Sequence, residues 1–320
     1  NEFGGDAERA SQTLGRKSVS VGFAHARRDR TEGLSRDSAL ELRLTTETEN
    51  YGDFRLDSQW VQFNPAAQDL LPARRSFNAT LYNNQLPVGA GWTADNAAGV
   101  VRSLQPLWVT SSYRVVLPSS LLMGATSLLA SDTAEVRVAA GNAGRLAGIG
   151  ILDFERTSGR LATMSSSVRL APAWQVGGAL MRFTDSQTIP DHTAATFALE
   201  YNPGPELRAR GHLLSNNGGR HGAWADLEYN PGRWRHRSGL YTLDPDLAYG
   251  DSRPQNDIRG AYLRSEFRSG FDIYVVGLES SQSNIKNDPA RSGTASDGGY
   301  ASMSLRLDRN TSVGAGVSVR

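Results

Sequence analysis

The sequence predicts an all-β chain, a transmembrane antiparallel up-and-down β-barrel, and three observations support this fold class. Apolar and polar residues alternate over stretches of about ten residues, the length a tilted strand needs to cross a bilayer. The connections between these stretches alternate between short and long. The hexapeptide LEYNPG occurs at Leu199–Gly204 and again at Leu227–Gly232, which indicates a structural unit that recurs along the chain.

Composition excludes several other classes of protein. The chain has 320 residues and no cysteine, so thiolate catalysis, disulfides and cysteine-bound zinc are excluded. Its 34 basic and 33 acidic residues give a net charge of +1, which argues against a nucleic-acid partner. No apolar run approaches the roughly 20 residues of a spanning helix. Both ends are abrupt, so we expect a segment of a longer chain.

Strands are assigned in order from the alternation. In Ser38–Glu49, for example, three leucines point one way while Glu41, Arg43 and Glu47 point the other. The front half reads as strands over Ser18–Arg27, Ser38–Glu49, Asp53–Phe63, Ser76–Tyr82, Trp108–Leu117, Leu121–Ala130, Ala134–Gly141, Leu146–Glu155 and Leu161–Leu170. The segment Asn83–Pro106 lacks clean alternation and is interpreted as a long or inward-folded loop. With the strands after Ala171, the total is about 18 strands in one domain over residues 1–320.

The connections after Leu161 carry a second signal. Nine in succession alternate between short and long, and outer-membrane barrels show this asymmetry, with short periplasmic turns and longer external loops. The short ones are Ala171–Trp174, Asn202–Glu206, Asn230–Arg233, Arg268–Gly270 and Asp308–Thr311. The long ones are Thr184–His192, Ser215–Gly222, Leu243–Asp257 and Ser280–Gly299.

On strand length, alternation, loop asymmetry and aromatic placement, the chain resembles a Gram-negative outer-membrane β-barrel of the export or porin type. The stretch AEVRVAAGNAGRLAG is similar in rhythm to the barrels of export proteins such as pilus ushers, but no usher motif is present and no residue role is transferred. The resemblance implies location in the bacterial outer membrane, contact with its lipid, and possible periplasmic or inner-membrane export partners. It implies no cofactor.

Charged residues on three successive predicted strands form a candidate lumenal ladder. A basic, an acidic and a basic strand lie side by side, and the members are Arg208, Arg210, Asp226, Glu228, Arg233, Arg235 and Arg237. One interpretation is a charged constriction or solute track. The alternative is cross-strand pairing that stiffens a wet wall, with each pair contributing under about 1 kcal/mol. The two interpretations are compatible.

Aromatic residues gather where predicted strands meet short turns. Tyr201 and Tyr229 precede such turns, and Trp174, Trp234 and Phe271 follow them. These five predict an interfacial girdle at the periplasmic rim. The alternative is turn-flanking packing in a soluble protein. In the hexapeptide, Leu and Tyr would face lipid, Glu would face the lumen, and Asn-Pro-Gly would close a tight turn.

Catalysis and metal binding have weak support in the sequence, which predicts no enzyme. The Asp191-His192 pair in a predicted external loop is more typical of solvated polar surface than of an acid–base pair. Asp244–Asp257 holds four aspartates, but their spacing does not match a calcium loop. The glycines of Gly141–Gly148 lack the Lys-Ser/Thr ending of a phosphate loop and predict a turn.

Three functions are consistent with such a barrel. The first hypothesis is a conduit that exports a polymer or fibre, because a wide barrel leaves an aqueous lumen. The second is a passive or substrate-specific porin, for which an inward loop would narrow the lumen. The third is a non-conducting receptor or structural anchor.

Overall fold

The computed structural model describes residues 16–30, 33–64, 73–148, 151–254, 256–309 and 311–320. In these ranges the chain forms 17 strands and one four-residue helix, α2 (Leu107–Thr110). Within the same ranges, no helix is both long and apolar enough to cross a membrane. The chain divides into two compact units: one contains Asn1–Leu104, Ser119–Met164 and Thr184–Thr188, and the other contains Gln105–Pro118, Ser165–Phe183 and Ile189–Arg320.

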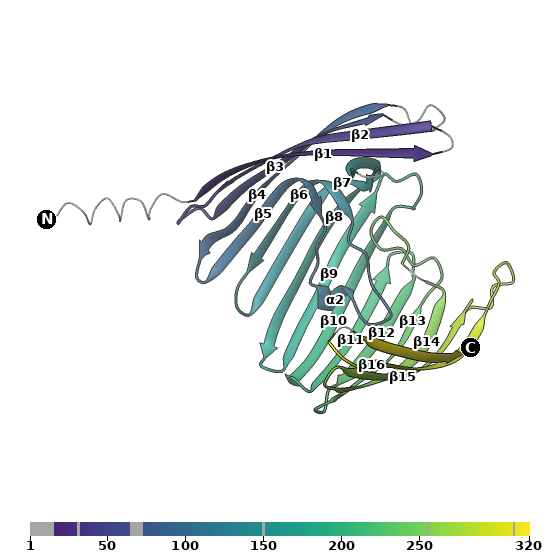
Figure 1. Ribbon diagram of the computed structural model, residues 1–320. Coiled ribbons are helices and arrows are strands. Elements are labelled where there is room, and N and C mark those ends of the chain that lie inside the picture. Colours follow the sequence, from purple (N-terminus) through teal and green to yellow (C-terminus); the bar gives the residue numbers. More distant parts are fainter. Residues whose placement is uncertain (1–15, 31–32, 65–72, 149–150, 255, 310) are drawn as a thin grey trace. The chain divides into compact units, whose positions relative to one another are not determined.

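In the first unit, β1 to β7 pair antiparallel in chain order (Figure 1). The strands are β1 (Lys17–Arg30), β2 (Gly33–Thr46), β3 (Asp53–Asn64), β4 (Arg74–Gly89), β5 (Trp92–Arg102), β6 (Leu121–Ala130) and β7 (Ala134–Ala147). The following strand, β8 (Asp153–Ala171), has residues in both units.

In the second unit, β9 to β17 also pair antiparallel in chain order. They are β9 (Trp174–Thr184), β10 (His192–Gly204), β11 (Leu207–Asn216), β12 (His221–Tyr229), β13 (Trp234–Leu243), β14 (Ile258–Ser269), β15 (Asp272–Ser283), β16 (Ala295–Arg306) and β17 (Ser312–Val319). The predicted all-β class of antiparallel up-and-down strands is confirmed.

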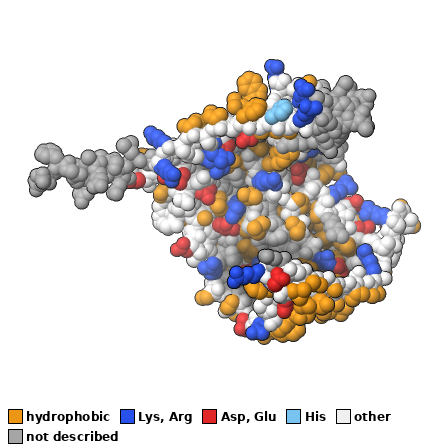
Figure 2. Space-filling view, in the orientation of Figure 1, with side chains coloured by type: hydrophobic (Ala, Val, Ile, Leu, Met, Phe, Trp, Pro, Cys, Tyr) orange, Lys and Arg blue, Asp and Glu red, His pale blue; other side chains and the backbone are white. Residues whose placement is uncertain are grey.

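Period-2 alternation gives the sheet of each unit an apolar and a polar face. In the first unit, Phe23, Leu40, Trp60 and Phe77 are cross-strand neighbours, and each is at least 51% exposed. In the second unit, the apolar face includes Phe197, Leu213, Leu240, Leu263 and Leu278, all exposed; Figure 2 shows hydrophobic side chains gathered over β15 and β16 at the bottom of the view. Exposed apolar surface this extensive requires an apolar partner, and lipid is the partner that the strand lengths predict.

Several assignments in the first half of the sequence are wrong. The turn expected at Gly141–Gly148 lies within β7, which continues to Ala147, and the expected strand Leu146–Glu155 spans the connection between β7 and β8. The expected loop Asn83–Pro106 is mostly strand, because β4 and β5 form a hairpin around Ala90–Gly91. Register shifts between Asn83 and Leu86 and between Pro87 and Gly89 break its alternation and hide the strand signal. Conversely, the expected strand Trp108–Leu117 contains α2 and a turn and is not a strand.

The two copies of LEYNPG end differently. In the first copy the strand β10 continues to Gly204, and the turn follows it. In the second copy β12 ends at Tyr229, and Gly232 lies in the turn with φ +63°. The expected turn with a glycine at positive φ is therefore found only in the second copy. What the copies share is the strand part, in which Glu200 and Glu228 both face the polar side of the sheet.

Candidate functional site

Six of the seven residues of the predicted charged ladder lie on the polar face of β11 to β13. Arg208 faces Glu228 and Arg210 faces Asp226 across β11 and β12, and Glu228 faces Arg237 across β12 and β13. Arg235 belongs to the same face of β13. Arg233 does not, because it lies in the turn before β13, where its Nη1 is 3.4 Å from Ser269 Oγ.

Each of three glutamates in this ladder binds two arginines. The N–O distances of the six contacts are 2.5 to 3.9 Å, and the groups are Glu200 with Arg208 and Arg210, Glu228 with Arg235 and Arg237, and Glu266 with Arg264 and Arg268. The two copies of the hexapeptide supply Glu200 and Glu228. With Asp226, which faces Arg210, the ladder has six arginines and four carboxylates and therefore carries an excess of positive charge.

The sequence did not assign Glu200, Glu266, Arg264 or Arg268 to the ladder. Glu266 follows the alternation of β14, so its face was predictable, but its partners Arg264 and Arg268 lie on its own strand at i−2 and i+2. Side chains two residues apart share a face, which is the signal that finds them. The side chain of Glu266 is only 8% exposed, so these two arginines offset a buried charge.

The segment 105–118, called the inward segment below, lies on this polar face. Figure 1 shows it as the long connection that carries α2 after β5. His212 on β11 bonds through Nε2 to the carbonyl oxygen of Trp108 at 2.8 Å, and its ring stacks on Trp224. Val109 is fully buried. Gly177 on β9 leaves the space for this contact, because a Cβ there would lie 2.7 Å from Trp108 Cζ2 and from Val109 Cγ2.

The tip of the inward segment contacts β13, β14 and β15. The ring of Tyr113 lies 4.9 Å from that of Tyr262, and Arg264 donates to the Tyr113 hydroxyl at 3.2 Å. The guanidinium of Arg237 lies 5.7 Å from the same ring. Arg114 forms an ion pair with Glu279 on β15. The tip is therefore attached through both aromatic and charged contacts.

The connection between β13 and β14 holds the start of the inward segment. Tyr249 in that connection is 1% exposed, and its hydroxyl donates to Oε1 of Gln105. Burial raises the pKa of Tyr249, so the hydroxyl stays protonated and able to donate. A long loop that the sequence assigned to the exterior thus packs part of its length against the inward segment.

Three of the four aspartates considered as a metal loop are bound by basic side chains. Arg291, in the connection between β15 and β16, contacts Asp246 at 2.7 Å and Asp257 at 3.3 Å, and Lys286 contacts Asp244 at 3.1 Å. Burial alone would raise the pKa of Asp244, but the His221 N–H and the Lys286 ammonium together lower it below its ordinary value. In the described part of the chain, no group of three or more His, Asp or Glu side chains is placed to hold a metal ion.

His192, the other residue considered for chemistry, is buried on β10. Its Nδ1 lies 2.9 Å from the carbonyl oxygen of Pro190, and its ring lies 5.8 Å from that of Phe183. These contacts account for a packed histidine at the start of a strand. They do not point to an acid–base role.

The predicted girdle residues lie beside short turns of the second unit. Trp174 and Tyr201 pack ring to ring at 4.6 Å across β9 and β10. Trp234 packs on Phe267 at 4.8 Å, and His236 stacks between Trp234 and Tyr229. Phe271 is 71% exposed, beneath the guanidinium of Arg306. Their position at a membrane interface remains a prediction.

Comparison with solved structures finds similar folds. The chain is similar to the outer membrane protein OpdK from Pseudomonas aeruginosa, with TM-score 0.52 and 11% identity, over 94% of this chain and 91% of that one. A structure of OpdK with vanillate gives TM-score 0.53 and 11% identity, over 96% of this chain and 92% of that one. No family model and no curated protein matches the sequence. The chain has the fold of Gram-negative outer-membrane β-barrels, the class that the sequence predicts.

Proposed function

We propose that the chain forms a passive diffusion channel in the bacterial outer membrane, narrowed by the inward segment and selective for small anions. The observation that carries the proposal is the attachment of residues 105–118 to the polar face of β9–β15. An apolar face suited to lipid on one side of the sheet and a charged face on the other is the arrangement of a water-filled barrel wall.

Anion preference follows from the ladder. Three glutamates and Asp226 face six arginines, so the wall beside the inward segment carries an excess of positive charge. Rings or ladders of arginine favour anions in pores. Vanillate, found with OpdK, is an aromatic carboxylate, and a solute of that charge suits such a wall.

Export of a polymer, the first hypothesis from the sequence, is not supported. A polymer must slide along an open wall, whereas the inward segment is bound to this wall at Trp108, Tyr113 and Arg114. The second hypothesis, a porin whose inward loop restricts the lumen, fits these contacts better. The inward loop is the segment after β5 and not the predicted Asn83–Pro106.

Planar-bilayer recording of the purified chain tests the proposal. We expect steady ohmic conductance, and in a KCl gradient a reversal potential displaced toward that of chloride. Replacing both Tyr113 and Arg114 by glycine should raise the conductance, while Arg253→Gly in the β13–β14 connection should not. Absence of conductance would favour the non-conducting anchor. A pore that conducts only when the inward segment is altered would instead support the export hypothesis.

A further inference from the structure

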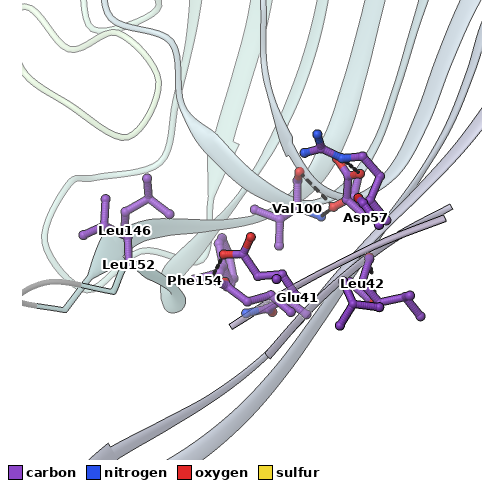
Figure 3. Close-up of a pocket in the computed structure, with 15 residues that line it drawn as sticks. Glu41, Leu42, Asp57, Val100, Leu146, Leu152 and Phe154 are labelled. Carbon is purple, nitrogen blue, oxygen red and sulfur yellow. Dashed lines mark hydrogen bonds and ion pairs between the residues drawn. The ribbon is translucent and has the colours of Figure 1, made fainter. Parts of the chain in front are cut away.

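A cavity of about 550 Å³ lies on the polar face of the first unit (Figure 3). Two cross-strand rows form its floor. One row is Gly22, Glu41, Gln59 and Asn78, and the other is Ser20, Arg43, Asp57 and Thr80. Its volume falls within the range of small-molecule sites.

Three apolar side chains from β7, β8 and their connection form the opposite wall. Leu146 and Leu152 are 44% and 53% exposed, although both line the cavity. Phe154 completes the wall, and its ring lies over Gly144, where a Cβ would come within 2.2 Å of Phe154 Cζ. Ile151 anchors this wall by packing on Ala39, Val61 and Phe63 of the sheet. The cavity is therefore apolar on one side and polar on the other.

Of the two carboxylates that line the cavity, Glu41 is less well paired with positive charge than Asp57. Asp57 binds Arg43 at 2.7 Å and Arg55 at 3.2 Å. Glu41, by contrast, accepts a hydrogen bond of 3.2 Å from the uncharged amide of Gln59 and is exposed to the cavity. Figure 3 shows Glu41 between the apolar residues Leu146, Leu152 and Phe154 on one side and Asp57 on the other.

Gly22 leaves open the space beside the Glu41 carboxylate in this cavity. Gly22 lies opposite Glu41 across β1 and β2, and a Cβ at Gly22 would meet Glu41 Cβ at 3.6 Å and Oε2 at 3.7 Å, which is ordinary contact. A larger side chain there would occupy the space in front of the carboxylate without straining the backbone. Gly22 therefore keeps the Glu41 carboxylate accessible.

We infer that this cavity binds a small organic cation, with its ammonium group at Glu41 and its apolar body against Leu146, Leu152 and Phe154. The nearby Arg43 is bound to Asp57, and Glu41 forms no ion pair within the described residues, so its carboxylate stands to gain from a charged donor. An aromatic ring beside that carboxylate adds attraction for a cation. The inference rests on the proposed function, because a solute reaches this face of the sheet only if the face borders a water-filled lumen.

Calorimetric titration of the detergent-solubilised chain with benzylammonium chloride at low salt tests the inference. We expect saturable binding, with benzyl alcohol and benzoate each binding at least tenfold more weakly. Glu41→Gln should weaken benzylammonium binding about tenfold, and Gly22→Val should abolish it. Glu47→Gln, a glutamate just beyond the end of β2, is the matched control and should bind as the original chain does.

Methyl NMR on labelled leucines gives a second readout. Benzylammonium should shift the methyl signals of Leu146 and Leu152, which are assigned through Leu146→Val and Leu152→Val. Equal binding of benzyl alcohol, or unchanged binding by Glu41→Gln, overturns the inference. If the chain conducts in bilayers without binding benzylammonium, only the cation site is wrong. If it binds the cation but never conducts, the proposed channel is wrong, and the cavity binds cations without the lumen that would deliver them in the membrane.

Discussion

The polar face of β10–β15 and the polar face of β1–β4 arise from the same alternation but present different surfaces. In the former, the side chains of Glu200, Glu228 and Glu266 are at most 21% exposed, and each holds two arginines. In the latter, Glu41 is exposed and has an amide as its partner. The inward segment covers part of the first surface, whereas apolar residues of β7 and β8 form a cavity over the second. Alternation sets which residues share a face, and the connections decide what each face becomes.

Gly177→Val should have the largest effect on the difference between the two faces, because it would fill the space in which the inward segment packs on β9. The added side chain would overlap Trp108 and Val109, and overpacking of this kind costs about 1–3 kcal/mol. We expect higher single-channel conductance and weaker anion preference, measured in planar bilayers. Gly211→Val on β11 is the control, because a Cβ there meets nothing within 4 Å. Equal conductance of the two variants would show that the inward segment does not limit the pore.

Most of the residues that share the polar face of the ladder could be predicted from the sequence. Alternation placed Arg208, Arg210, Asp226, Glu228, Arg235 and Arg237 on one face, and the register brings them together. It misplaced Arg233, since a turn before β13 breaks the period. The sequence also gave no distance between strands far apart in the chain, so the shared cavity of Glu41 and Phe154 was beyond its reach.

The inward segment escaped sequence reasoning for a physical reason. Its residues Leu107 to Leu117 are rich in aromatic and β-branched side chains, which favour strands. Tertiary contacts at Trp108 and Tyr113 override this preference. The hairpin before it was missed because bulges disrupt its alternation, and Gly99 at φ +130° disturbs β5 further. Local pattern therefore fails where strand geometry is irregular and where loops pack on sheets.

A second test separates buried from exposed glutamates. Glu266→Gln removes a carboxylate that is 8% exposed and leaves Arg264 and Arg268 without their anion, which should cost about 2 kcal/mol. Anion preference should rise, because one negative charge is lost from the wall. Thermal unfolding in detergent and reversal potentials measure the two effects. Glu41→Gln should leave the unfolding temperature unchanged. Equal destabilisation by both variants would contradict the inference that Glu266 is a buried, paired carboxylate and Glu41 is not.

A third, smaller effect is expected at the tip of the inward segment. Tyr113→Phe keeps the ring contact with Tyr262 and removes the hydroxyl that accepts from Arg264 at 3.2 Å. Such a hydrogen bond contributes about 1 kcal/mol. We expect more frequent current fluctuations with unchanged mean conductance, while Tyr113→Ala, which loses both contacts, should also raise the mean. No change in noise for Tyr113→Phe would mean that ring packing alone fixes the tip.

The smallest expected effect is a loss of stability of the folded β13–β14 connection at low pH. The lowered pKa of Asp244 means that its carboxylate stabilises the folded connection at neutral pH, through the His221 N–H and Lys286. This contribution is complete above the ordinary pKa of an aspartate, about 4, and is lost as the pH falls through the lower pKa of the folded state. Hydrogen exchange of residues 244–254 should therefore accelerate below about pH 4. Asp244→Asn should exchange faster at neutral pH and lose the acid step, whereas Asp132→Asn in the β6–β7 turn should behave as the original chain does. If hydrogen exchange in Asp244→Asn still accelerates below about pH 4, another carboxylate causes the acceleration. The contact between this connection and β12 would then not depend on the charge of Asp244.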